Sequence, residues 1–398
     1  MSASAPVATH EPPGQAAAPR GLLRSSRSRA LIVAGLIVLG LVFLFGGDEW
    51  LSILDFTLIA AIAALSLNVL TGYAGQISLG ITFFMGLGAY TAAWLGGNPP
   101  SAPGDPVGLG LSFLIWLPAA GIVAALAGAL IGPTALRLKG FYLAIVTLAL
   151  VFIGQYLFLN LRGITGGPQG RSFPAPGFGD FTFASPDPIF GFQFTTNQLY
   201  FVLLVIVLVV SAVFIANVMR SRAGRAFQAV RDNEVGAAIM GVNLFEAKMG
   251  AFILSSFLAG IAGALWASYP GFAAPNTWSL VLSIQFVAAI LIGGVASVWG
   301  SILGAAFVFA LPLVLEMILP QLQSASSVGL SSGNVSTIVY GALIIVFLLF
   351  EPAGVIGLIR RGQILLRRFD DRRKGGKSAT VLASSESESQ LDVESSKL

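Results

Sequence analysis

The sequence contains no cysteine, one histidine and few charged residues. Without cysteine, neither a disulfide framework nor a thiolate metal site can form in this chain. The one histidine, His10, lies in a polar stretch near the first residue, which leaves no histidine cluster, proton relay or Ser-His triad. A G-x-x-x-x-G-K-S/T loop is also absent, so the chain has no P-loop nucleotide site of its own.

Hydrophobic residues take the place of the missing charges. They make up 56% of the chain, whereas charged residues make up 10% and the net charge is +4. Soluble domains carry about 25% charged residues, and apolar surface left in water costs about 25 cal/mol per Å². The composition therefore predicts that a lipid bilayer surrounds most of the chain. Because the basic residues flank hydrophobic runs, we expect them to meet lipid headgroups, and no nucleic-acid partner is predicted.

Long hydrophobic runs predict an all-α integral membrane protein with about ten transmembrane helices, since each crossing needs about 20 apolar residues. The predicted spans are 30–46, 51–70, 77–97, 110–135, 141–160, 199–219, 249–269, 278–295, 299–319 and 335–350. No A-x-A-like cleavage site follows the first run, so we interpret it as an uncleaved signal anchor. Ten spans divide into five and five, and an odd number of spans in each half would place the halves in inverted orientation.

The distribution of basic residues predicts the topology. With the N-terminus inside, 20 of the 22 Lys and Arg residues fall on the inner side, and only Arg162 and Arg171 fall outside. Both termini are therefore expected to be cytoplasmic. The inner regions between spans are 71–76, 136–140, 220–248 and 296–298. A disordered cytoplasmic tail over 1–29, a transmembrane domain over 30–350 and a basic, then Ser/Glu-rich, cytoplasmic tail over 351–398 complete the predicted organisation.

The first segment of interest, residues 68–80, breaks one hydrophobic stretch and begins the next. Polar groups at or near membrane depth need partners, which indicates a bundle interior or a water-lined translocation path. The alternative is an ordinary turn between helices, packed through small residues. The candidate path or helix-break residues are Asn68, Gly72, Gly75, Gln76, Ser78 and Gly80.

A second segment, residues 220–248, is too long for a minimal helix connection on the inner side. Its sequence predicts a short amphipathic helix that breaks near Asp232-Asn233. Such a helix suits docking into a groove of another protein, or it lies on the membrane with its arginines against headgroups. The residues alone leave both alternatives open.

Two glycine-rich stretches and the few ionisable residues in the spans complete the pattern. Residues 163–170 predict a structured turn after the fifth span, and 291–305 predict a tight turn between two closely packed spans. Asp55, Glu316 and Glu351 fall toward span ends, where we expect water to reach them. The lack of a carboxylate at mid-membrane argues against a proton- or sodium-coupled carrier.

Taken together and in this order, the four segments resemble permease subunits of branched-chain amino acid ABC transporters, of the LivM type. The combination of TGYAGQISLG, ITGGPQG, GRAFQAVRDNEVGAAIMGV and IGGVASVWGSILGA carries the resemblance. The matching stretches are Leu67 to Tyr90, Leu138 to Gly170, Ser221 to Trp266 and Pro275 to Ala306. The tails and the first span do not take part.

The resemblance implies that residues 221–242 form the coupling loop that docks on an ATPase subunit. Its candidate residues are Gly224, Arg225, Ala226, Arg231, Glu234, Ala237, Ala238 and Gly241. The run beginning at Glu234 is similar to a loosened EAA motif, from which it departs because two residues separate Glu234 from the alanine pair.

The resemblance also implies a function and a set of partners. We expect a permease subunit, not an enzyme, that imports branched-chain or other hydrophobic amino acids across a bacterial cell membrane. The implied partners are a second permease of the LivH type, two cytoplasmic ATP-binding subunits and an external solute-binding protein. ATP would bind to the partners, and this chain would bind no cofactor. Urea or a short amide is the alternative cargo, and a standalone channel or ion-coupled carrier is the alternative class, because neither needs the loop at 220–248. A membrane enzyme lacks a catalytic constellation here.

Overall fold

The computed structural model describes residues 47–97, 108–135, 140–173, 175–178, 181–183 and 195–323, with a few positions between 341 and 357. The chain divides into two compact units, Met1–Gly47 and Asp48–Leu398. The first unit lies outside the described residues except for Gly47. The predicted N-terminal tail and first span therefore remain predictions, as does most of the C-terminal tail.

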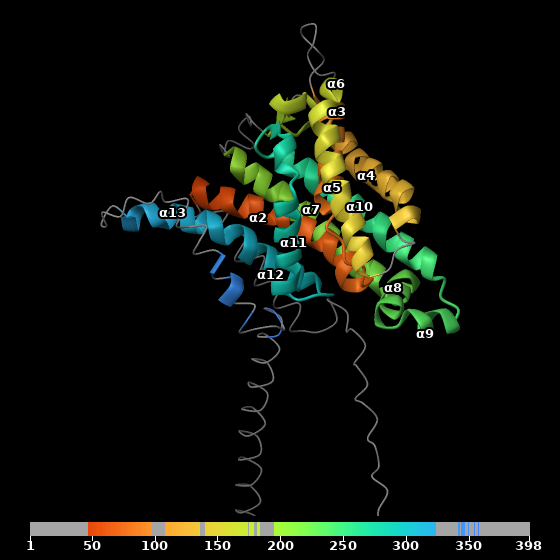
Figure 1. The fold of residues 1–398 in the computed structure, drawn as a ribbon. Helices are drawn as coiled ribbons and strands as arrows, with labels where there is room; N and C mark the ends of the chain where they lie inside the picture. Colours follow the sequence, from red (N-terminus) through yellow and green to blue (C-terminus); the bar gives the residue numbers. More distant parts are fainter. Residues whose placement is uncertain are drawn as a thin grey trace, which may run out of the picture. The chain divides into compact units, whose positions relative to one another are not determined.

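Helices dominate the second unit (Figure 1). The long helices are α2 (Asp48–Leu67), α3 (Ile81–Gly96), α4 (Phe113–Ala135), α5 (Phe141–Asn160), α7 (Thr196–Arg220), α10 (Leu244–Ser268), α11 (Leu280–Gly293) and α13 (Leu311–Gln323). The shorter ones are η1 (Asn68–Tyr73), α6 (Arg162–Thr165), η2 (Gly167–Gln169), α8 (Arg222–Asp232), α9 (Glu234–Ile239), η3 (Pro275–Thr277), α12 (Val298–Ala305) and η4 (Ala306–Ala310).

Within the described residues, four two-residue strands accompany the helices, and the all-α prediction did not include them. Strand β1 (Arg171–Ser172) pairs antiparallel with β4 (Phe272–Ala273), and β2 (Gly177–Phe178) pairs with β3 (Phe181–Thr182). Both pairs lie in connections between long helices. Strands this short satisfy backbone groups locally and leave the helical architecture unchanged.

Eight of the ten predicted spans have a counterpart among the described helices. Six helical stretches are long and apolar enough to cross a membrane: Asp48–Tyr73, Phe113–Thr134, Phe141–Asn160, Thr196–Arg220, Leu244–Ser268 and Val298–Met317. The shorter apolar helices Ile81–Gly96 and Leu280–Gly293 match the other two. Span 30–46 and most of span 335–350 lie outside the described residues, so the total of ten stays a prediction. The chain is a helical membrane protein that crosses the bilayer several times.

Close backbone contacts between helices build the core. Helix α10 packs against α3 and α4, while α2 packs against α7, α10 and α12. A Cβ atom on Gly88 would collide with the backbone of Gly260, and one on Gly263 would collide with the backbone of Met85. In a bilayer, where lipid tails are as apolar as side chains, small residues that let backbones approach are what hold helices together.

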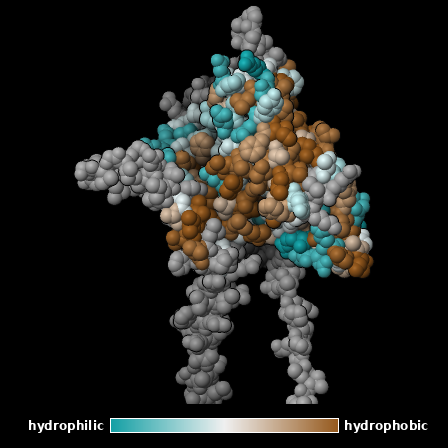
Figure 2. Space-filling model, viewed as in Figure 1, coloured by the Kyte–Doolittle hydropathy of each residue, from teal (hydrophilic) through white to brown (hydrophobic). Residues whose placement is uncertain are grey.

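The outer surface of the bundle is apolar. Helix α4 exposes Leu126 and Leu130, and α5 exposes Phe152 and Ile153. Figure 2 shows the resulting brown surface over the middle of the bundle, with teal hydrophilic surface beside α8. Contiguous apolar surface of this extent is typical of a lipid-facing protein.

Asp55 departs from the expectation that water reaches it. It is fully buried in α2, because α7 and α10 cover the helix there. Glu316 in α13 is exposed, as expected, and Glu351 lies outside the described residues. The sequence gives the position of Asp55 relative to the end of its helix. It does not show which neighbouring helices enclose the side chain.

The described segments 71–76, 220–248 and 296–298, which the basic residues assign to the inner side, lie together at one end of the bundle. The Gln76 side chain donates a hydrogen bond to the Lys248 carbonyl (3.1 Å), and the Ala296 amide donates to the Asn68 side chain (2.9 Å). The β1–β4 pair lies beyond the other end of α10, whose 25 residues at about 1.5 Å each separate the two ends. This grouping agrees with the predicted topology.

Candidate functional site at the coupling end

A π-helical turn ends the first described span. Residues Asn68–Tyr73 continue α2 as η1, after which Gly75 takes a positive φ of 69°. The backbone amide of Gln76 donates to the Leu70 carbonyl (3.0 Å), and the Thr71 hydroxyl donates to the backbone carbonyl of Gln76 (3.1 Å). A π-turn leaves backbone groups out of the regular ladder and is found frequently at functional sites.

Asn68 ties this turn to the connection between α11 and α12. Its amide nitrogen donates to the Ser297 carbonyl (2.9 Å) and the Ser301 hydroxyl (2.6 Å), and its amide oxygen accepts from the Ala296 amide (2.9 Å). A Cβ atom on Gly72 would collide with the Asn68 side chain and the Ala296 amide. The glycine is therefore required for the Asn68 side chain to reach across.

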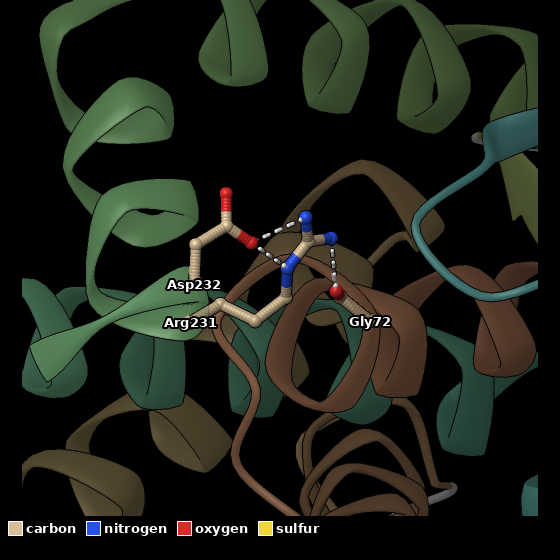
Figure 3. A network of polar contacts seen from close by, with 3 residues as sticks. All are labelled: Gly72, Arg231 and Asp232. Atoms are coloured by element: carbon tan, nitrogen blue, oxygen red, sulfur yellow. Dashed lines mark hydrogen bonds and ion pairs between the residues drawn. The ribbon is translucent and has the colours of Figure 1, made fainter. Parts of the chain in front are cut away.

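Arg231 attaches the amphipathic helix α8 to the other side of the same turn (Figure 3). Its Nη1 atom donates to the Gly72 carbonyl (3.1 Å), while Nε and Nη2 donate to one oxygen of Asp232 (3.0 and 2.8 Å). A Cβ atom on Gly75 would press on the Arg231 side chain. The η1 turn is thus held between α8 and the α11–α12 connection.

A polar corner joins α8 to α9. The predicted break at Asp232-Asn233 is confirmed, and the Asn233 side chain caps α9 by accepting from the Gly236 amide (3.0 Å). At the start of α10, Lys248 pairs with Glu234, with 2.6 Å between Nζ and Oε1. The orientation of α9 is therefore fixed by its cap and by one ion pair.

The predicted coupling residues divide into inward and outward groups. Gly224 lies against the Met219 backbone, Ala237 is buried and Ala226 is half-buried. Arg231 and Glu234 bond to other elements of the chain, although Arg231 is partly exposed. Arg225, Ala238 and Gly241 are exposed, and Arg225 bonds locally to the Arg220 carbonyl (2.9 Å). Gly241 has a φ of 83°, so a side chain there strains the backbone whatever space is available. Of the remaining path candidates, Ser78 accepts from the Gly80 amide (3.2 Å), and Gly80 lies against Thr147.

Sequence reasoning missed three strongly exposed apolar residues of this end. Val235, Ile239 and Met240 are 70%, 82% and 77% exposed, and together they form what we call the α9 patch. Figure 2 shows brown apolar surface beyond the teal hydrophilic surface that lies beside α8. Val235 and Ile239 lie four residues apart on α9, which places them on one helix face. This four-residue spacing is the signal in the sequence that predicts an apolar helix face.

We expect Arg231→Glu to lower uptake more than it lowers attachment of a partner protein. The new carboxylate would lie against the Gly72 carbonyl and the Asp232 carboxylate, so α8 would separate from η1 while the α9 patch stayed in place. The ratio of uptake to the amount of co-purified partner measures whether uptake falls more than attachment does. Arg222→Glu, an exposed charge reversal on the same helix, is the control and should preserve the ratio. An equal ratio for both variants would contradict the role of the Arg231–Gly72 contact.

At the opposite end, residues 163–170 form the predicted structured turn. Gly166, Gly167 and Gly170 all have positive φ, and the Thr165 hydroxyl donates to the Phe158 carbonyl (2.7 Å). Arg171 follows, buried, with Nη1 donating to the Ile164 carbonyl (2.9 Å). Burial lowers the pKa of this guanidinium, because desolvation disfavours its charged form. The turn holds this end of the bundle together.

A bundle of apolar helices whose one end carries a polar turn, an amphipathic helix and an exposed apolar patch is the architecture of a helical membrane protein with an elaborated end. Residues 50–348 match a family described as the branched-chain amino acid transport system / permease component. The chain belongs to this family and is a membrane permease component.

Individual relatives agree with the family match. The chain is 31% identical over 350 residues to the high-affinity branched-chain amino acid transport system permease protein LivM of Escherichia coli, covering 84% of this chain and 77% of the relative. It is 32% identical to LivM of Salmonella typhimurium, over 76% and 69% of the two chains. LivH of Salmonella typhimurium is 26% identical over 52% of this chain and 62% of its own. No solved structure matches the chain.

Proposed function

We propose that this chain is the permease subunit of an ATP-driven importer for branched-chain amino acids. The carrying observation is the similarity to LivM, which extends over most of both chains. The family match at residues 50–348 includes η1, the α8–α9 segment and the α11–α12 connection, which contact one another in the fold. Urea or a short amide is the second candidate cargo, since the contacts at this end do not select a substrate.

The proposal includes partners and an orientation. A second permease of the LivH type would complete the translocation path, two cytoplasmic ATPases would bind ATP, and an external solute-binding protein would deliver the cargo. This chain would bind no cofactor. The placement of 20 of 22 basic residues on one side supports cytoplasmic termini in a bacterial cytoplasmic membrane.

Coupling to the ATPases would run through the α8–α9 segment. The α9 patch presents apolar surface that lipid or a protein groove must cover. When the ATPases close, a movement of α8 would pass through Arg231 to the Gly72 carbonyl. From η1 it would continue through Asn68 to the α11–α12 connection. Each step is a hydrogen bond that the structure contains.

Uptake by the reconstituted importer tests the proposal. Proteoliposomes holding this chain, the second permease and both ATPases should accumulate radiolabelled leucine when ATP is inside and the binding protein outside. Unlabelled isoleucine and valine should compete, whereas urea and short amides should not. Competition by urea alone would transfer the assignment to the second candidate cargo. Accumulation without ATP or the ATPases would contradict the importer class.

A further inference from the structure

Helix α7 presents one apolar face along most of its length. Its 25 residues at about 1.5 Å each exceed the roughly 30 Å of a bilayer's hydrocarbon core, so the two ends of the helix reach headgroup depth. The members of the face recur every three or four residues, as one side of a helix requires. They are between 44% and 62% exposed, and they are Val202, Ile206, Val210 and Val213. Lipid acyl chains suit such a surface.

The same face of α7 ends in polar and cationic side chains. Asn217 and Arg220 follow Val213 by four and seven residues, which keeps them on that side of the helix, and both are exposed. Neither side chain makes a hydrogen bond or an ion pair with the described part of the chain. An arginine at the end of a lipid-facing helix extends its guanidinium toward the headgroups. The face therefore changes from apolar to cationic at the depth where headgroups lie.

A second arginine is held at this end of α7. Helix α8 packs against the last turn of α7, since a Cβ atom on Gly224 would collide with the Met219 backbone. This contact lets the Arg225 Nη1 atom donate to the Arg220 carbonyl (2.9 Å). Among the described residues, no carboxylate pairs with Arg220, Arg222 or Arg225. Cations gathered at one corner repel one another, and a bound anion offsets that repulsion.

The acidic residues that follow along this segment are distant and already paired. Helix α8 has 11 residues, so about 15 Å separates its first residue from Asp232. Asp232 pairs with Arg231, and Glu234 pairs with Lys248. The α9 patch follows this corner in the chain. The arginines at the α7–α8 junction therefore form a surface separate from the α9 patch.

We propose that the last turn of α7 and the first turn of α8 bind the phosphate of an anionic phospholipid whose acyl chain lies along the exposed face of α7. The continuity of an apolar face with a cationic end matches one molecule that carries both an acyl chain and a phosphate. The guanidiniums of Arg220 and Arg225 would donate to phosphate oxygens, for which their planar donor geometry is suited. An anionic headgroup is favoured over a zwitterionic one, whose ammonium the arginines repel. The bound lipid would hold α8 to α7 and leave the α9 patch free.

Native mass spectrometry of the purified full chain in detergent tests the site. The chain is titrated with dioleoylphosphatidylglycerol, which is anionic, or with dioleoylphosphatidylcholine, which is zwitterionic, and wild type should bind the anionic lipid more tightly. A cation near a membrane surface contributes about fivefold in affinity. Arg220→Gln should therefore weaken phosphatidylglycerol binding about fivefold, and Arg220→Gln with Arg225→Gln about twenty-fivefold. Phosphatidylcholine binding should change little.

Arg162→Gln is the matched control, because it removes one exposed positive charge at the opposite end of the bundle and should leave lipid binding unchanged. The Arg220 side chain makes no bond within the described residues, so Arg220→Gln alone serves if the double variant fails to purify. Glycerol 1-phosphate carries the phosphate without acyl chains and should compete only at about a hundredfold higher concentration. Competition at equal concentration would show a plain phosphate site and overturn the lipid assignment. Equal binding of the two lipids, or equal effects of Arg220→Gln and Arg162→Gln, would overturn the inference as well.

Discussion

Replacing Ile239 with glutamate should detach the ATPases and abolish uptake while leaving insertion and abundance normal. Ile239 is 82% exposed at the centre of the α9 patch, so the substitution disturbs no packing within this chain. In a docked complex the same position is covered by the partner, where a buried, unpaired carboxylate is strongly unfavourable. We expect association to weaken at least a hundredfold, measured by co-purification of the ATPases and by uptake.

The control places the same charge where no ATPase is expected. Asn160→Glu adds a carboxylate at an exposed position at the far end of α5 and should leave ATPase association unchanged. Ile239→Leu keeps the apolar contact and should retain most of the binding. If Ile239→Glu retained full association and uptake, the α9 patch would face lipid, and ATPase docking would have to lie elsewhere.

Replacing Asn68 with alanine should be among the most destabilising single changes in this chain. The substitution removes three hydrogen bonds and leaves the Ala296 amide, the Ser297 carbonyl and the Ser301 hydroxyl without this partner. Individual hydrogen bonds in membrane proteins contribute about 0.6 kcal/mol and up to about 1.7 kcal/mol, so the loss of three is about 2–5 kcal/mol. Thermal unfolding of the purified protein in detergent, together with its abundance in membranes, measures the loss.

Two further variants separate the network from the residue. Asn160→Ala removes one hydrogen bond within a single helix, from Asn160 to the Tyr156 carbonyl, and should change the unfolding temperature little. Gly72→Ala leaves Asn68 in place but puts a methyl group where the Asn68 side chain crosses, so it should reproduce much of the Asn68→Ala effect. Stability of Asn68→Ala equal to that of Asn160→Ala would show that the network contributes little.

The contacts at the coupling end divide the predicted coupling residues of 221–242 into two groups with different roles. Arg231 and Glu234 were predicted to face the ATPase with Arg225, yet they bond to Gly72 and Lys248 of this chain. We therefore expect their substitutions to impair transmission of movement, and substitutions in the α9 patch to impair attachment. Comparing uptake with co-purification distinguishes the two roles.

Much of the architecture followed from the sequence alone. Hydrophobic runs of sufficient length set eight of the helices, because an unsatisfied backbone group in lipid is too costly for any other local structure. The break at Asp232-Asn233 followed from side chains that compete with the helical backbone and cap the next helix. The family was likewise determined by the sequence, since four local segments in a fixed order carry it.

Only the tertiary structure decided which of these local segments meet. Asn68 and Ala296 are 228 positions apart and Gly72 and Arg231 are 159 apart, and no periodicity in either segment specifies such a partner. The burial of Asp55 and the exposure of Ile239 have the same origin, because burial depends on the elements packed around a residue. The sequence determined where helices begin and end, since those are local free energies. The site at the coupling end was decided by packing, which joins segments distant along the chain.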